Sequence, residues 1–161
     1  MAEHILLVYY SRSGNTRAIA NLIHREVGGT IHEIRPEVPY PESYDAVVDQ
    51  AGKEIQTGYK PALHSTLDHI ESYDTIFVGS PNWWSTIAPP VAAFLSQYDL
   101  SGKTVAPFCT HGGGGLGNIN KDIAKLCPHS TILSSFEIYG SEAGNAQARV
   151  SAWLRKVGMT H

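Results

Sequence analysis

The chain lacks several features that mark whole classes of protein. Only two of its 161 residues are cysteine, Cys109 and Cys127, and no CxxC pair occurs. We therefore expect neither a disulfide framework nor a metal site, but buried free thiols in a reducing, cytoplasmic compartment. No run of about 18 apolar residues occurs, so no segment is expected to span a membrane.

Charge is also scarce and evenly spread. The formal net charge is −3 at pH 7, and neither basic nor acidic residues form a long run. This balance disfavours nucleic acid or an anionic membrane as the main partner. The apolar run after His4 is too short for the hydrophobic region of a signal peptide. Because no internal repeat or linker is found, we expect residues 1–161 to form one domain.

Several enzyme signatures are incomplete. The run from His111 to Gly114 matches the oxyanion-hole motif of lipases, but the nucleophile elbow G-x-S-x-G does not occur. Neither cysteine is followed by the x5-Arg that a phosphatase needs, and serines stand where a phosphorelay receiver domain would need aspartates. The first expected strand–helix loop contains a single glycine, Gly14, so the G-x-G-x-x-G motif of a dinucleotide-binding domain is missing there.

The chain does contain a regular alternation of strand and helix patterns. Strands are predicted over residues 4–10, 30–35, 75–80, 104–109 and 131–139. Helices are predicted over 15–27, from Ser43 to Gly58, from Pro89 to Tyr98, from Leu116 to Leu126, and over 144–157. Such alternation is typical of a three-layer α/β fold with a parallel sheet, here of five strands.

The first loop, Tyr10 to Thr16, carries the strongest functional signal. It follows the apolar residues Ile5 to Tyr9 and precedes a run with helical spacing. Its hydroxyls can donate to an anion, and the unpaired N–H groups and partial positive charge at a helix start favour a phosphate. We expect a site for a phosphate monoester. The alternative is an ordinary strand–helix loop with a capping side chain.

Ser11, Ser13, Gly14, Asn15 and Thr16 resemble the S/T-x-S/T-G-N-T loop with which flavodoxins hold the phosphate of FMN. The resemblance continues through Phe77–Trp84 and Pro107–Gly117. It implies a flavodoxin-like sheet in the order 2-1-3-4-5, whose loops after strands one, three and four share one edge. By position, it implies that FMN is bound by Ser11, Arg12, Ser13, Gly14, Asn15, Thr16, Pro81, Asn82, Trp83, Trp84, Ser85, Thr110, His111, Gly112, Gly113 and Gly117.

The second and third loops have compositions that suit a flat aromatic ring. Trp83 and Trp84 are adjacent, so their side chains should point in opposite directions and at least one should be exposed. The alternative is that both pack under helices. Five of the six residues 112–117 are glycine, whose N–H groups can approach the edge of an isoalloxazine ring closely. His111 either places a charge or a donor at that edge or is bonded to the backbone.

The resemblance leaves two functions open. One is an electron carrier that docks a redox partner protein, and the other is an NAD(P)H-dependent FMN oxidoreductase for quinones, nitro or azo compounds. Trp83 and Trp84 could block the flavin face that a nicotinamide needs, which favours the carrier. The mild net charge speaks less for a carrier, since flavodoxin carriers are commonly strongly acidic. No catalytic side chain is predicted, because the flavin supplies the redox chemistry.

Overall fold

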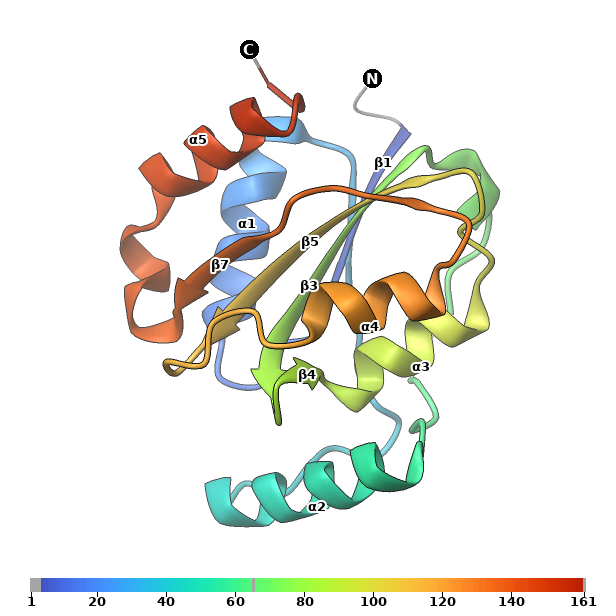
Figure 1. Ribbon diagram of the computed structural model, residues 1–161, viewed down its shortest axis with the longest axis vertical. Helices are drawn as coiled ribbons and strands as arrows, with labels where there is room; N and C mark the ends of the chain where they lie inside the picture. Colours follow the sequence, from blue (N-terminus) through green and yellow to red (C-terminus); the bar gives the residue numbers. More distant parts are fainter. Residues whose placement is uncertain (1–3, 65, 161) are drawn as a thin grey trace.

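The computed structural model describes residues 4–64 and 66–160, which form a parallel sheet covered by helices on both faces (Figure 1). Four strands form the main part of the sheet, namely β1 (Ile5–Tyr9), β2 (Thr30–Glu33), β3 (Thr75–Trp83) and β5 (Thr104–His111). Two short strands, β6 (Thr131–Ile132) and β7 (Phe136–Tyr139), both pair in parallel with β5. The sheet order is β2-β1-β3-β5-β6, with β7 also beside β5.

The predicted three-layer α/β fold is confirmed, but the sheet has seven strands among the described residues instead of five. One addition is β4 (Thr86–Ile87), a short antiparallel partner of β3. The other arises because the strand predicted over 131–139 is interrupted. The Leu133 N–H still bonds to the Val105 carbonyl, but pairing with β5 resumes only at Phe136. The predicted order 2-1-3-4-5 therefore becomes β2-β1-β3-β5-β6, because β4 is inserted before the fourth predicted strand and the fifth is divided into β6 and β7.

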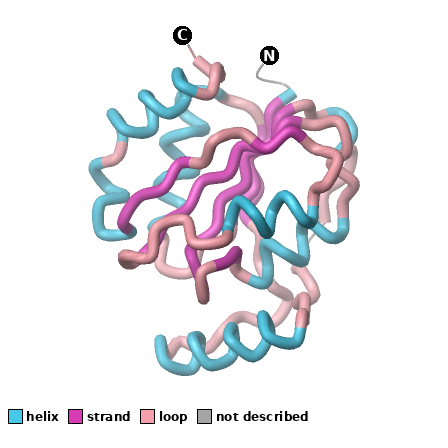
Figure 2. The backbone as a smooth tube through the Cα atoms, in the orientation of Figure 1, coloured by secondary structure: helices cyan, strands magenta, loops and turns pink. Residues whose placement is uncertain are grey.

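Helices cover both faces of the sheet (Figure 2). One face carries α1 (Asn15–Val27) and α5 (Gln147–Lys156), and the other carries α3 (Pro89–Gln97) and α4 (Ile119–Leu126). A short 3-10 helix, η3 (Gly140–Asn145), leads into α5, and another, η2 (Ile70–Ser72), precedes β3. In the described ranges no helix is long and apolar enough to cross a bilayer.

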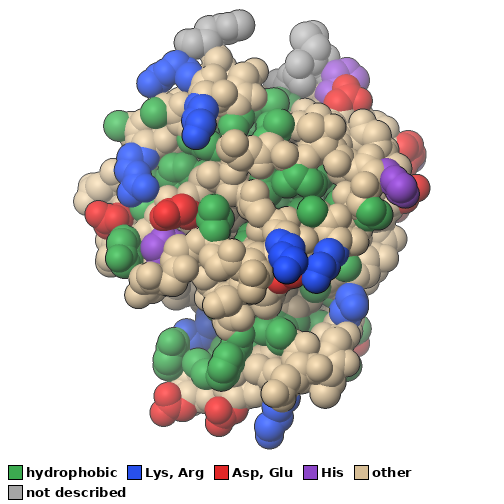
Figure 3. All heavy atoms as spheres, viewed as in Figure 1, with side chains coloured by type: hydrophobic (Ala, Val, Ile, Leu, Met, Phe, Trp, Pro, Cys, Tyr) green, Lys and Arg blue, Asp and Glu red, His purple; other side chains and the backbone are tan. Residues whose placement is uncertain are grey.

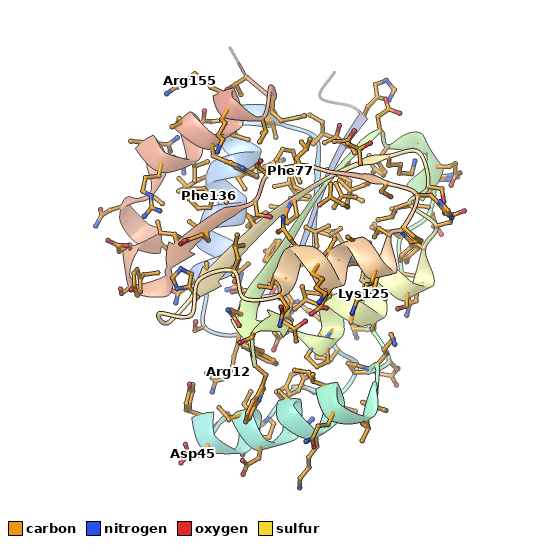
Figure 4. The ribbon with its side chains drawn as sticks, in the orientation of Figure 1. Arg12, Asp45, Phe77, Lys125, Phe136 and Arg155 are labelled. Atoms are coloured by element: carbon orange, nitrogen blue, oxygen red, sulfur yellow. The ribbon has the colours of Figure 1, made fainter. Side chains whose placement is uncertain are left out.

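The core has two halves because alternate residues of the buried strands point to opposite faces. Leu6 and Val8 of β1 pack toward α3 and α4, whereas Leu7 packs toward α1 and α5. Phe77 of β3 is fully buried in the second half, near the centre of the sheet (Figure 4). Continuous apolar runs in the central strands therefore serve two cores at once.

Helix α2 (Tyr44–Thr57) lies apart from these layers, beyond the carboxyl end of the sheet (Figure 1). As the sequence predicts, α2 begins after Ser43, because the Ser43 hydroxyl accepts a hydrogen bond from the Ala46 N–H at the helix start. It ends at Gly58, whose φ is 71°. A capped start and a left-handed glycine end fix the length of this helix without help from the core.

Candidate functional site

A cavity of about 610 Å³ lies at the carboxyl end of the sheet, between α2 and the loops that follow β1, β3 and β5. Its volume is typical of small-molecule sites, which span about 300–1,000 Å³. Three loops far apart in sequence thus meet, as their strand order requires. The predicted residues that line the cavity are Arg12, Ser13, Asn15, Thr16, Pro81, Asn82, Trp83, Trp84, Thr110, His111 and Gly112.

The remaining predicted residues, Ser11, Gly14, Ser85, Gly113 and Gly117, are not part of the lining. They shape the loops. The Ser11 hydroxyl accepts a hydrogen bond of 3.1 Å from the Gly14 N–H, which curls the first loop. A Cβ on Gly117, whose φ is 52°, would lie 2.7 Å from the Ser85 carbonyl oxygen, so the second and third loops touch only because this residue is glycine.

Sequence reasoning missed two groups of lining residues. One group comes from α2 and consists of Tyr44, Val47, Val48 and Ala51. The other lies at the end of β7 and just after it, and consists of Tyr139, Gly140 and Ser141. The second group lies at the end of the last strand, at the same edge of the sheet, so its polar and small residues were a usable signal. The first group had only an amphipathic pattern, which does not say what a helix packs against.

The first loop forms a polar end of the cavity. The Thr16 hydroxyl lies 2.8 Å from that of Thr110, and both are buried, so this pair ties the first loop to the third. Ser13 is exposed to the cavity. The residue before α1 is Gly14, which has no side chain to cap the helix. The first N–H groups of α1 therefore stay free of side-chain partners and can bind an anion.

Arg12 leaves the first loop toward α2 (Figure 4). Its guanidinium donates a hydrogen bond of 2.9 Å to the Glu42 carbonyl and lies 5.9 Å from the centre of the Tyr44 ring. A cation over an aromatic face is stabilised by about 0.5–1 kcal/mol at an exposed position. Arg12 thus connects the polar end of the cavity to the start of α2.

The two adjacent tryptophans have different surroundings. Trp83 makes edge-to-face contacts with Tyr10 and Tyr40, at ring separations of 5.4 and 5.2 Å. Burial raises the pKa of Tyr10 to about 12, so its phenol stays protonated within this cluster. Trp84 is 59% exposed, and its Nε1 donates to the Val48 carbonyl of α2 at 2.9 Å. The expectation that at least one of the two indoles is exposed is confirmed.

The third loop is held by His111, which is 8% exposed. Its Nδ1 accepts a hydrogen bond of 3.0 Å from the Gly113 N–H, and its Nε2 lies 2.8 Å from a carboxylate oxygen of Glu137. This pattern requires the proton on Nε2. Of the two predicted roles, the backbone-bonded one is observed. The side-chain amide of Asn82 also holds this loop, because it donates a hydrogen bond of 2.7 Å to the Gly115 carbonyl.

The charge and polarity of the cavity differ between its two ends. Among the described residues, no Asp or Glu contributes to the lining, whereas Arg12 does. Hydrophobic side chains gather where α2 faces the rest of the molecule (Figure 3). Donors without carboxylates suit an anion. Aromatic and aliphatic walls suit a flat apolar group. One ligand that carries both a phosphate and an aromatic ring would satisfy both ends.

A family model described as flavodoxin matches residues 4–157. The chain belongs to the flavodoxin family. A flavoprotein from Bacteroides uniformis superposes with a TM-score of 0.84 at 28% identity, over 96% of this chain and 99% of its own. A flavoprotein from Lactobacillus acidophilus, whose crystal structure contains FMN, has a TM-score of 0.72 at 26% identity, over 89% of this chain and 98% of its own.

This flavodoxin-family chain also has a longer relative whose name states an enzymatic activity. An NAD(P)H dehydrogenase (quinone) from Azorhizobium caulinodans is 33% identical over 68% of this chain. The match spans 59% of that relative, so the chain covers less than two thirds of its length. The match therefore leaves about two fifths of the dehydrogenase without a counterpart in the alignment.

Proposed function

We propose that the chain is a redox protein that passes electrons through FMN bound in the cavity. The observation that carries this proposal is the division of the cavity into a polar end without carboxylates and an aromatic end. FMN, the cofactor of the flavodoxin family, has a phosphate and an isoalloxazine ring at its two ends. When bound, FMN supplies the redox chemistry, and the protein supplies binding, orientation and electrostatics.

The phosphate is assigned to the first loop. Ser13, Asn15 and Thr16 offer side-chain donors beside the free N–H groups at the start of α1. Gly140 leaves room for the side chain of Asn15, since a Cβ on Gly140 would lie 2.5 Å from the side-chain amide nitrogen of Asn15. A hydrogen bond to a charged group contributes about 1.5–3 kcal/mol, so two or three of them give a strong preference for the phosphorylated flavin.

The isoalloxazine ring is assigned to the aromatic end. Trp84 offers an exposed indole, and an aromatic pair contributes about 0.5–1.5 kcal/mol beyond the area it buries. Gly112 and Asn82 also line the cavity. His111 uses both ring nitrogens within the protein, so its role is to hold the glycine loop in place.

Electron transfer to a partner protein is the first candidate activity. Three of the aromatic side chains that line the cavity are exposed, namely Tyr44, Trp84 and Tyr139. A ring bound behind them would be close to the surface, where a redox partner docks. We also infer a cytoplasmic location, because Cys109 and Cys127 are free buried thiols whose pKa values burial raises to about 12 and about 11.

Direct reduction of quinones by NAD(P)H is the second candidate. It is favoured by the dehydrogenase relative and by the apolar wall that α2 adds to the cavity. That wall consists of the aliphatic side chains of Val47, Val48 and Ala51, which suit contact with a flat apolar molecule. The relative is longer than this chain, so the activity requires that the shared part suffices for it.

One anaerobic experiment separates the two candidates. The purified protein is loaded with FMN, and NADPH or NADH is added while flavin absorbance is followed. Bleaching by the nicotinamide alone at a catalytic rate, recorded after mixing in a stopped-flow instrument, with turnover on added quinone, supports the reductase. Reduction that needs a separate reductase protein supports the carrier. Failure of the protein to retain FMN on a desalting column would contradict both.

A further inference from the structure

The β3–β4 hairpin closes with a turn that its residues do not favour. Trp83 pairs with Thr86, so Trp84 and Ser85 form a two-residue turn, with φ angles of 56° and 66°. Turns of this kind usually contain Gly, Asn or Asp, since a Cβ is strained at positive φ. Such strain persists only where surrounding contacts hold it, and it concentrates at functional sites.

The Trp84 indole supplies a contact that holds the turn. Its Nε1 donates a hydrogen bond of 2.9 Å to the carbonyl of Val48, in α2. One helical turn later stands Gly52, and a Cβ there would lie 3.0 Å from Cε2 and Cζ2 of the indole. That distance is shorter than an ordinary van der Waals contact. The missing side chain therefore opens a notch through which the indole reaches the helix backbone.

Gly52 has no other evident reason to be glycine. It lies in the interior of α2, where glycine is less favourable than alanine because it loses more backbone freedom on folding. It is not at a turn or at the end of the helix, which is Gly58. The packing against Trp84 explains its presence. Val48 and Ala51, which flank the notch, line the same cavity as the indole.

We propose that Gly52 and the Val48 carbonyl form an indole seat that positions Trp84 as the aromatic contact of the bound isoalloxazine ring. The inference rests on the proposed FMN site and adds to it a positioning residue, Gly52, outside the three flavodoxin loops. Through this seat α2 acts on the ring end of the cofactor and not on its phosphate end. Trp83, locked between two tyrosines, needs no such support.

The seat is tested first without cofactor. Nitrogen-15 NMR of the FMN-free protein shows the indole N–H signals of Trp83, Trp84 and Trp153. Gly52→Ala should shift the Trp84 signal and speed its hydrogen exchange at least about tenfold, because the hydrogen bond to Val48 is lost. Trp153, whose indole donates to the Ser134 carbonyl, is the internal control and should not change. An unmoved Trp84 signal would overturn the seat.

The effect on the cofactor is tested by FMN titration in a double-mutant cycle. Gly52→Ala should raise the Kd for FMN about 2- to 12-fold, the loss expected for a misplaced aromatic contact. In a Trp84→Phe background, the same change should have no further effect. Gln56→Ala, on the exposed side of α2, is the control for helix propensity and should leave the Kd unchanged.

The outcomes distinguish this inference from the proposed function. If Gly52→Ala weakens FMN equally in both backgrounds, its effect does not pass through Trp84 and the inference is wrong. The inference also fails if the wild-type protein binds FMN and Trp84→Phe changes neither affinity nor flavin emission, while the proposed function then stands. If the wild-type protein does not bind FMN, the proposed function is wrong. The role of the indole seat in FMN binding is then wrong as well.

Discussion

Helices α1 and α2 border the same cavity, but the body of the protein holds them to different degrees. The buried residues of α1 are Thr16, Ile19, Ala20, Ile23 and Val27. Over the whole described length of α2, the buried residues are Val47 and Ala51. A helix with an apolar stripe along its full length is fixed by the core. A helix with two buried positions depends on its remaining contacts.

Besides its contacts with α3 and the hydrogen bond from the Tyr40 hydroxyl to Glu54, α2 is held by two loops of the site itself. Arg12 of the first loop bonds to the Glu42 carbonyl just before α2, and Trp84 of the second loop bonds to the Val48 carbonyl within it. The polar end of the cavity is therefore built on a rigid helix start. The aromatic end depends partly on α2, which is itself held by contacts from the site loops. We therefore expect the phosphate end of the cavity to be more preorganised for its ligand than the ring end.

The largest expected difference between the two helices is in stability. Ile23→Ala, in α1, should lower the free energy of unfolding by about 2–5 kcal/mol, the usual range for a fully buried aliphatic side chain. Val47→Ala, in α2, removes two methyl groups and should cost about 1–2 kcal/mol. Urea unfolding followed by circular dichroism measures both. Equal losses would show that α2 is held as firmly as α1.

Two hydroxyls of the first loop should separate binding from stability. Thr16→Ala removes the partner of the buried Thr110 hydroxyl, so it should lower the free energy of unfolding by about 1–3 kcal/mol and also weaken FMN binding. Ser13→Ala, at an exposed position, should weaken FMN binding while stability stays within about 0.5 kcal/mol. FMN titration and urea unfolding of each variant decide this. An unchanged Kd in both would remove these hydroxyls from the phosphate site.

The ring end should respond to Trp84→Ala in a different observable. Loss of the indole should raise the Kd for FMN by only about 2- to 12-fold, the range that an aromatic contact provides. The emission of bound flavin should increase, because the stacked indole no longer quenches it. Riboflavin and FMN should lose similar factors in affinity, since the phosphate is not involved. A loss confined to FMN would move Trp84 to the phosphate end.

The smallest effect is expected at Glu33, at the end of β2 where the chain leaves for α2. Burial raises the pKa of Glu33, but ion pairs with Arg17 at 2.7 Å and Arg35 at 3.2 Å outweigh it and hold the pKa below its usual value of 4.5. A lowered carboxyl pKa stabilises the folded state above the unfolded-state pKa. That stabilisation is lost as the pH falls through the folded-state pKa.

Glu33→Gln should therefore cost about 0.2–1 kcal/mol at pH 7, as is usual for partly exposed ion pairs, and the difference from wild type should shrink as the pH falls below about 4.5. Urea unfolding at both pH values measures it. Glu37→Gln, at an exposed position in the same crossover, is the matched control and should show no such dependence. A difference that grows in acid would contradict the assignment.

Local signals predicted much of this fold. Helix α1 has the predicted bounds, 15–27, and α2 starts after Ser43 and ends at Gly58 as expected. These boundaries depend on residues next to one another in the chain. The interruption between β6 and β7 was not predicted, because it depends on distant partners: the Trp153 indole bonds to the Ser134 carbonyl, and Ser135 bonds to Asn120.

The candidate site was predictable where it follows strand ends and not where it depends on tertiary packing. The three loops meet because the sheet order brings them together. The position of α2 over the cavity was missed, since its apolar stripe does not name its partner. Gly52 and the Trp84–Ser85 turn contradict local preferences, and only the contact between them accounts for both.

The most direct test of the central claim is calorimetric titration of the FMN-free protein with FMN and, separately, with riboflavin. If the first loop holds the phosphate and the aromatic end holds the ring, one FMN binds per chain, with a Kd at least about 100-fold below that of riboflavin, the effect of two or more charge-assisted hydrogen bonds. Equal affinity for the two flavins, or no binding of FMN, would contradict it.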